Sequence, residues 1–316
     1  MKTIEHINNS KKPFASFEIL PPLKGTKIQD LYDILDPLME FKPPFINVTY
    51  HRSEFIYKKR ENGLLEKVVI RKRPGTVGIC TAIMNKYGVD TVPHIICGGF
   101  TKEETEDALL DLHYLGIENL LALRGDPTKN ETSFMPEIGG HKNAIDLVRQ
   151  AINLNSGVYL EDGLKGLKTD FCVGIAGYPE KHHEAANPTS DLKYLKEKVD
   201  AGAEYIVTQL FYDNEKYFQF VKNCRDIGID VPIIPGLKPI SSKKQLTALP
   251  RIFNIDIPEE LNMEIQKCKS DEEAAYIGEK WTISQSKELL KYGAPCLHFY
   301  TMSKIDGFVR IAREVF

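Results

Sequence analysis

Four segments of the chain end a helix-like run on a glycine and begin an apolar, strand-like run within a few residues. The glycines are Gly116, Gly202, Gly228 and Gly293. A glycine just past a helix supplies the left-handed residue that caps it. An apolar run after so short a connection is typical of a buried parallel strand. The repeated unit therefore predicts helices packed around a parallel sheet.

Eight apolar runs have the length of strands, and a helix-like segment follows each of them. The runs are 15–20, 45–50, 92–97, 119–125, 172–179, 205–211, 232–238 and 297–301. Eight such units favour an α/β fold of the closed (β/α)8 type, a TIM barrel, over an open sheet. We therefore predict one barrel domain.

The chain is longer than such a barrel requires. A (β/α)8 barrel needs about 250 residues, and the chain has 316. We assign the excess to three places: a polar, mobile tail over 1–12, a connection over 155–170, and extra helices over 257–281. The last of these lies between the seventh and eighth strands, so the barrel domain is expected to span 13–316.

Composition excludes several classes of protein. Hydrophobic residues make up 42% of the chain and charged residues 27%, as in ordinary globular proteins. The net charge of −3 gives no long-range attraction to nucleic acid or to an anionic membrane. No apolar stretch approaches a membrane span, and the N-terminus lacks the apolar core of a signal peptide. We expect a cytoplasmic protein without nucleic-acid or membrane partners.

The sequence offers little support for a metal or disulfide site. The six cysteines stand alone, which predicts buried reduced thiols. His182, His183 and Glu184 are adjacent, and neighbours in sequence do not share a helix face, so a polar loop is favoured over a metal site. The glycine-rich motifs of the usual dinucleotide and P-loop sites are absent.

Polar residues stand where the apolar runs end. In a (β/α)8 barrel the carboxyl ends of the strands form the active-site face. Arg124, Asp126, Gln209, Lys238 and His298 lie at or near such ends. These residues are therefore candidates for a functional site.

Glu18 is the sharpest candidate for chemistry. It lies in the apolar segment FASFEILPP, which two prolines terminate. A carboxylate in this position is either part of a structural salt bridge or a functional acid. Burial in apolar surroundings raises the pKa of a carboxyl group, which suits a general acid.

Three further candidates each have a structural alternative. Gly125 permits close backbone approach and Arg124 offers a planar fork for phosphate, although an ion pair between Arg124 and Asp126 at the rim explains them equally. Gln209 is an amide in an apolar strand, which fits a heterocycle with an amide-like edge or a core hydrogen bond to a neighbouring strand. Tyr178 and His182 could flank a flat ring and its phosphates, or form only a loop.

Taken together, these segments resemble the methylenetetrahydrofolate reductase family. The matching motifs occur in the family order: SFEILPP, INVTY, PHIIC, ALRGD, GYPEKHHEA, LKEKVDAGAEYIVTQLFYD, IIPGLKPI and LHFYTMSK. The resemblance covers about residues 14 to 312 and is closest to the bacterial form with a single catalytic domain. It implies a (β/α)8 barrel that binds FAD, works as a homo-oligomer, and reduces 5,10-methylenetetrahydrofolate to 5-methyltetrahydrofolate for methionine synthesis. NADH or NADPH is the implied co-substrate, with ping-pong hydride transfer through the flavin.

The resemblance also implies roles for individual residues. Glu18 falls on the general acid, and Asp126 falls on a catalytic carboxylate beside both flavin and folate. The implied cofactor-binding positions are Thr49 (on the nicotinamide side), Tyr50, Arg52, His94, Arg124, Gly125, Asp126, Ala144, Tyr178, His182, Asp191 and Lys198. The implied substrate-binding positions are Asp126, Gln209, Gln245 and Lys304.

Four positions depart from the family pattern. Lys304 stands where many bacterial members have arginine, and Leu249 stands where some members have an aromatic residue. Tyr194 and Glu197 also differ from the family's residues near the implied FAD.

Three other functions stay open. Proline dehydrogenase also uses FAD in such a barrel. A barrel lyase could form a Schiff base on Lys238. A non-catalytic folate- or flavin-binding subunit is the third alternative.

Overall fold

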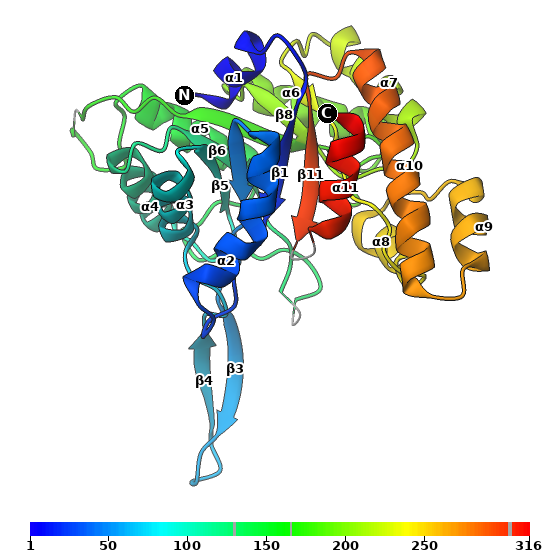
Figure 1. Cartoon of the computed structure of the whole chain (residues 1–316). Coiled ribbons are helices and arrows are strands. Elements are labelled where there is room, and N and C mark those ends of the chain that lie inside the picture. The colour runs from blue at the N-terminus through cyan, green and yellow to red at the C-terminus, as the bar shows by residue number, and fades with distance from the viewer. Residues whose placement is uncertain (129–130, 165, 303–304) are drawn as a thin grey trace.

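The computed structural model describes residues 1–128, 131–164, 166–302 and 305–316, and it shows a nearly closed parallel barrel (Figure 1). The strands follow the order β10-β11-β1-β2-β5-β6-β7-β8-β9. Their bounds are β1 (Phe14–Ile19), β2 (Phe45–Val48), β5 (Asp90–Ile96), β6 (Asn119–Leu123), β7 (Cys172–Gly177), β8 (Tyr205–Thr208), β9 (Ile233–Ile234), β10 (Gly236–Leu237) and β11 (Cys296–Met302). β9 and β10 are the two halves of one expected strand, divided at Pro235, so eight strand positions close the barrel.

Helices surround the barrel and cover its outer face (Figure 1). The outer helices are α2 (Ile28–Leu35), η1 (Asp36–Phe41), α3 (Thr76–Tyr87), α4 (Lys102–Tyr114), α5 (Ala144–Asn155), α6 (Pro188–Asp200), α7 (Asn214–Asp226) and α11 (Asp306–Val315). The four glycines that end helix-like runs have φ values of 72°, 114°, 76° and 104°. The left-handed cap that the sequence predicts at each is confirmed, and so is the TIM-barrel fold.

Three helices lie between the seventh and eighth strands, as the sequence predicts. They are α8 (Gln245–Phe253), α9 (Glu259–Lys267) and α10 (Asp271–Tyr292). They bury an apolar cluster of their own that includes Leu249, Leu261 and Ala274. Gly278 lets α10 approach the backbone closely, since a Cβ there would lie 2.0 Å from the Ile240 carbonyl oxygen. The insertion therefore packs onto the barrel.

The N-terminal segment differs from the mobile tail that we predict from its polarity. Residues Thr3–Asn9 form α1, and the Thr3 side chain is fully buried. The Thr3 amide and hydroxyl donate to Asn119 Oδ1 at 2.6 and 3.0 Å. Ile7 packs with Phe45 and Val92 in the cluster inside the barrel. α1 therefore covers the amino-terminal end of the barrel, and its seven residues are too few for a recognisable helical period.

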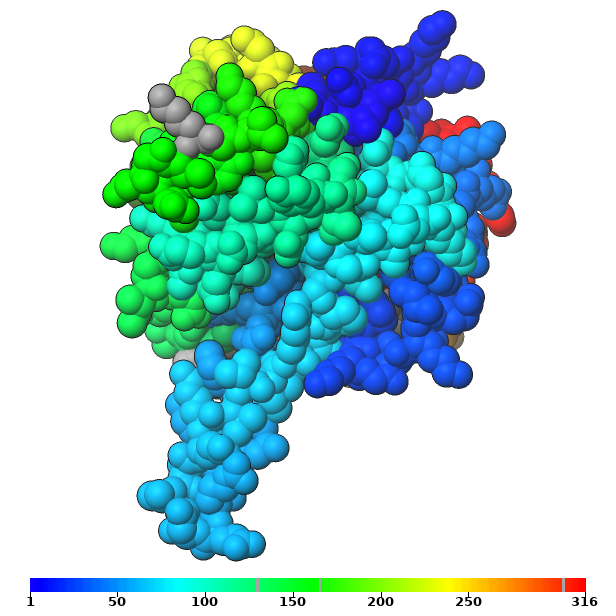
Figure 2. Space-filling view, turned by 90° about the vertical axis from the view of Figure 1, so that its left-hand side faces the viewer, coloured from blue at the N-terminus to red at the C-terminus, as the bar shows by residue number. Residues whose placement is uncertain are grey.

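A second difference is an antiparallel hairpin between β2 and α3. β3 (Glu54–Lys59) pairs with β4 (Leu65–Ile70), and the ribbon projects well beyond the barrel (Figures 1 and 2). Glu61, Asn62 and Gly63 form its turn, in which the Gly63 amide donates to the Arg60 carbonyl oxygen at 2.9 Å and Gly63 has φ 80°. Among the described helices, none has the length and apolarity needed to cross a membrane.

Candidate active site

Glu18 lies inside the barrel near the carboxyl ends of the strands. Its exposed fraction is 9%. Its Oε2 atom lies 3.5 Å from Nε2 of His94 on β5 and 3.7 Å from Nε2 of His298 on β11. Neither histidine nitrogen has a hydrogen-bond partner among the described residues. Buried polar atoms of this kind are uncommon and indicate a place for a bound group or water.

Strand register explains why these groups meet. Glu18 lies opposite Tyr300 of β11, but the next residue, Ile19, lies opposite Met302. The extra residue, Thr301, donates its hydroxyl to the Glu18 carbonyl oxygen at 2.7 Å. Such a bulge changes the direction of neighbouring side chains and is common beside active sites.

A hydroxyl one layer deeper in the barrel orients the second histidine. Ser16 Oγ lies 2.9 Å from His298 Nδ1, and the two residues face each other in the register of β1 and β11. Because Nδ1 is engaged in this way, Nε2 is the ring nitrogen that His298 presents toward Glu18.

The charge state of Glu18 differs from the expectation drawn from burial alone. Burial raises the pKa of Glu18, but contacts with His94 and His298 and the charge of Lys238 outweigh it, so the net pKa is lowered. Burial lowers the pKa of His94 to about 4, so that histidine is neutral at neutral pH. Glu18 is therefore an ionised carboxylate at neutral pH, and Lys238 supplies a standing positive charge that favours this form.

Two arginines at the rim are engaged by glutamates from neighbouring loops. Arg52, which follows β2, pairs with Glu131, and Arg124, which follows β6, pairs with Glu184. The ion pair of Arg124 is therefore not the one with Asp126 that the sequence leaves open. Both guanidinium groups are held on the carboxyl face, where a phosphate could exchange for a carboxylate.

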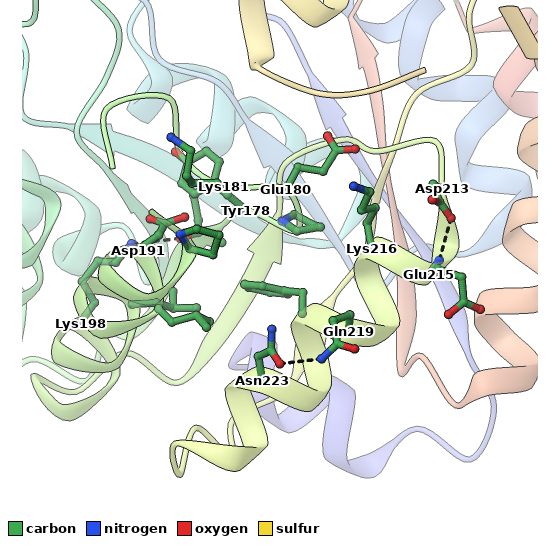
Figure 3. A pocket seen from close by; sticks show the side chains of 17 residues that line it. Tyr178, Glu180, Lys181, Asp191, Lys198, Asp213, Glu215, Lys216, Gln219 and Asn223 are labelled. Carbon is green, nitrogen blue, oxygen red and sulfur yellow. Dashed lines mark hydrogen bonds between the residues drawn. The ribbon is translucent and has the colours of Figure 1, made fainter. Parts of the chain in front are cut away.

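A cavity of about 400 Å³ opens beside this face, between the end of β7, α6 and α7 (Figure 3). Its lining includes Tyr178, Asp191 and Lys198. Lys198 Nζ donates to the Ala176 carbonyl oxygen at 3.0 Å, and burial lowers its pKa to about 8 against the opposing charge of Asp191. A cation held this way at neutral pH suits an anionic ligand.

Two tyrosines connect the cavity to Glu18. Burial raises the pKa of Tyr178, and the charges of Asp191 and Asp126 raise it further. Burial also raises the pKa of Tyr300, and the charges of Glu18 and Tyr178 raise it further. The Tyr300 hydroxyl donates to the Thr208 carbonyl oxygen at 2.6 Å. Tyr300 is therefore near enough to both Glu18 and Tyr178 for their charges to affect its pKa.

A sequence model of the family described as methylenetetrahydrofolate reductase matches residues 3–315. The chain belongs to the methylenetetrahydrofolate reductase family. It is 32% identical over 293 residues to the 5,10-methylenetetrahydrofolate reductase of Salmonella typhimurium, covering 92% of this chain and 87% of that protein.

Relatives in plants are longer. The chain is 33% identical over 311 residues to methylenetetrahydrofolate reductase (NADH) 1 of Arabidopsis thaliana, covering 95% of this chain and 48% of that protein. The chain thus spans about half the length of the plant relatives that it matches. A solved structure from Clostridium thermocellum, described as binding two copies of 5-methyl-5,6,7,8-tetrahydrofolic acid, has a TM-score of 0.57 at 15% identity. The match covers 98% of both chains and shows a shared fold.

Several positions implied by the resemblance to this reductase family lie close together. Tyr178 and His182 meet edge to face with ring centroids 4.7 Å apart, and the His182 amide donates to Asp191 at 2.8 Å. Burial lowers the pKa of His182 to about 4. With Lys198, these residues form one cluster at the cavity, distinct from the pair of Glu18 and His94 inside the barrel.

The other implied cofactor positions are spread around the same face. Asp126 is exposed, and Gly125 before it has φ 87°. Thr49 and Tyr50 follow β2, with the Tyr50 ring centroid 5.0 Å from that of Phe100. Ala144 is the first residue of α5. All follow carboxyl ends of strands or begin a helix there, as the barrel requires.

The implied substrate positions have mixed outcomes. Gln209 follows β8, and its Oε1 accepts from the Leu210 amide at 2.9 Å, so its side chain makes this local contact rather than the cross-strand bond considered from the sequence. Gln245 begins α8 and accepts from the Ser241 amide at 2.6 Å. Lys304 lies outside the described residues.

Sequence reasoning did not find every residue of the site. His298 and Lys238 stand out as strand-end residues, but nothing local connects them to Glu18. Tyr300 was missed, although residues 296–302 alternate in the way that places His298 and Tyr300 on one face. Within the described residues, no group of three or more His, Cys, Asp or Glu could hold a metal ion.

Proposed function

We propose that this chain uses bound FAD to reduce 5,10-methylenetetrahydrofolate to 5-methyltetrahydrofolate with electrons from a reduced nicotinamide. The observation that carries the proposal is the buried Glu18 carboxylate, set between two histidines at the carboxyl end of the barrel. Family membership supports the reaction, and so does the name of the Salmonella relative. Relatives named for NADH and for NADPH both match, so both nucleotides are candidates.

The residues present fit a flavin dinucleotide. Arg52 and Arg124 would hold its diphosphate in place of their present glutamate partners. The cavity beside Tyr178 and Lys198 would take the nucleoside end. The unpartnered Nε2 of His94 would meet polar atoms at the flat ring. The two arginines, Lys198 and the His94 nitrogen would each gain a polar partner in the dinucleotide.

Bound FAD supplies the acceptor and donor of hydride, and the chain supplies protons, charge and position. Glu18 gives a proton to a ring nitrogen of the folate, which opens its five-membered ring. A flat ligand over Glu18 excludes water and raises the pKa of this carboxyl from its lowered value, which favours the protonated acid. Asp126 favours positive charge on the folate. Nicotinamide and folate must reach the same ring face, so one pocket serves them in turn.

The test is an anaerobic titration of the purified, FAD-loaded protein followed by its absorbance spectrum. NADH or NADPH should bleach the flavin bands, and 5,10-methylenetetrahydrofolate should restore them. Proline serves as the control for the proline dehydrogenase alternative and should cause no bleaching. A protein that takes up no FAD, or a reduced flavin that the folate does not reoxidise, would contradict the proposal.

A further inference from the structure

Glu180 fastens two segments of the candidate site to each other. Glu180 lies in the loop between β7 and α6, and both of its carboxylate oxygens accept from the Asp256 amide, at 3.0 and 3.1 Å. Asp256 lies just beyond the end of α8. Beside this contact, Asn254 Nδ2 donates to the Lys181 carbonyl oxygen at 3.3 Å. Glu180 and Lys181 of this loop therefore hold Asp256 and Asn254 at the end of α8.

Both sides of the contact use an unusual backbone conformation. Lys181 has φ 121°, and Asn254, the C-cap of α8, has φ 54°. Non-glycine residues rarely occupy this region, and they stay there when the surrounding structure holds them. The chain thus turns sharply at both partners, and the turns present the Lys181 carbonyl and the Asp256 amide to the opposite segment.

The fastened helix carries residues that the family resemblance assigns to the folate. Gln245 is the first residue of α8, and Leu249 is buried one turn later. The loop on the other side leads to His182 and Asp191 at the cavity. Because α8 has only nine residues, fixing its C-terminal end against the loop also restrains Gln245 relative to the cofactor cluster.

Charged groups from three elements face Glu180. Burial, together with the charges of Asp256 and Asp213, raises the pKa of Glu180 to about 7, although the Asp256 amide and Lys216 of α7 oppose this rise. Lys216 Nζ also lies 3.5 Å from Asp256 Oδ2. Figure 3 shows Glu180, Lys216 and Asp213 around the cavity. The carboxyl group therefore changes its charge near neutral pH while the contact is closed.

The direction of the pH effect follows from linkage. If the contact opens, Glu180 meets water and regains an ordinary glutamate pKa of about 4.3. The closed form then binds its proton more tightly than the open form, so a proton favours closure. Above about pH 7 the closed form must hold a buried, ionised carboxylate close to two other carboxylates. Closure therefore becomes less favourable as the pH rises from about 4.3 to about 7, and it changes little at higher pH.

We infer that Glu180 is a positioning residue that sets α8, and with it Gln245, against the loop between β7 and α6, and that this hold loosens as the pH rises from acid values to neutrality. Its effect on the folate rests on the proposed function. Its effect on the end of α8 does not, because the contact is made by this chain alone. The two effects can therefore be measured separately.

The kinetic test compares two variants of Glu180. Glu180→Gln keeps an oxygen for the Asp256 amide but cannot ionise, so the KM for 5,10-methylenetetrahydrofolate should stay low from about pH 5 to about pH 8. In the unaltered protein this KM should rise several-fold over the same range. Glu180→Ala lacks the acceptor and should have a raised KM even at about pH 5. Glu264→Gln, which alters an exposed carboxylate of α9 outside the lining of the cavity, should follow the unaltered protein.

Amide hydrogen exchange of residues 251–258 in the FAD-loaded protein, without folate, tests the contact itself. Comparison of Glu180→Gln with the unaltered protein at each pH removes the intrinsic pH dependence of exchange. The variant should exchange more slowly than the unaltered protein near pH 8, and by a much smaller factor near pH 5. Equal exchange at both pH values would overturn the inference, even if the protein reduced folate. If Glu180→Gln exchanges more slowly but its KM has the same pH dependence as the KM of the unaltered protein, the positioning role would be overturned.

Discussion

Glu18 Oε2 lies 3.5 Å from His94 Nε2, inside the barrel, without a hydrogen bond between them. Burial keeps His94 neutral, with a pKa of about 4, so the histidine does not neutralise the carboxylate at physiological pH. Lys238, whose own pKa burial lowers, supplies the standing charge that favours ionised Glu18. Glu18 is therefore ionised in the free protein, and a bound ligand that excludes water can raise its pKa and convert it to the protonated acid.

The Lys238→Met variant tests this balance of charge. Lys238 lowers the pKa of Glu18, so removal of its charge should raise that pKa and keep Glu18 protonated to higher pH. In rapid mixing of reduced protein with 5,10-methylenetetrahydrofolate, the loss of rate at alkaline pH should move upward by about one pH unit. Lys243→Met, which alters an exposed lysine, is the control. An unshifted profile would show that Lys238 does not tune Glu18.

The same lysine separates the reductase from the lyase alternative. A Schiff base on Lys238 would be trapped by borohydride in the presence of a carbonyl substrate, giving a covalent adduct visible by mass spectrometry. We expect no adduct at Lys238, since its ammonium group is balanced by Glu18 and its Nζ donates to the Tyr300 carbonyl oxygen at 3.4 Å. A trapped adduct would favour the lyase.

FAD retention should depend on the charge of Lys198. Because the pKa of Lys198 is about 8, its positive charge is lost as the pH rises through that value. FAD should therefore dissociate more readily at about pH 9 than at pH 7, and added salt should increase this loss. Lys198→Arg should bind FAD equally at both pH values, measured by fluorescence of released flavin. Lys196→Arg, on the solvent side of the same helix, should behave like the unaltered protein. A pH-independent affinity before mutation would refute the role.

α1 should contribute measurably to stability. Ile7 is 9% exposed and packs with residues of the barrel interior, so Ile7→Ala should lower the free energy of unfolding by about 2–3 kcal/mol. Urea unfolding followed by circular dichroism measures this. Ile138→Ala, at a position that is 99% exposed, should change it by less than about 0.5 kcal/mol. Equal midpoints for the two variants would mean that α1 is not docked in solution.

The barrel could be predicted from the sequence because its signals are local and repeated. Gly116 and Gly202 end helices just before apolar strands, and the pattern recurs around the whole sheet. The hairpin could not be predicted as easily, although Asn62 and Gly63 are residues typical of a hairpin turn. Its strands are mostly exposed on both faces, so neither has the alternation of apolar and polar residues that marks a half-buried strand.

The chemistry of the site could be predicted only in part. The position of Glu18 in an apolar strand marks it as unusual, but its pKa depends on His94, His298 and Lys238, which reach it from three other strands. The partners of Arg52 and Arg124 likewise come from loops distant in sequence. Charge balance in a closed barrel is set by residues that only the fold brings together.

The most direct test of the account is rapid mixing of the FAD-loaded Glu18→Gln variant, with the two half-reactions measured separately. Bleaching of the flavin by NADH or NADPH should proceed at close to the unaltered rate, because nicotinamide oxidation needs no proton from Glu18. Reoxidation by 5,10-methylenetetrahydrofolate should slow by about 10²-fold or more, as expected for loss of a general acid. Reoxidation by the folate at the unaltered rate would contradict the assignment of Glu18 as the proton donor.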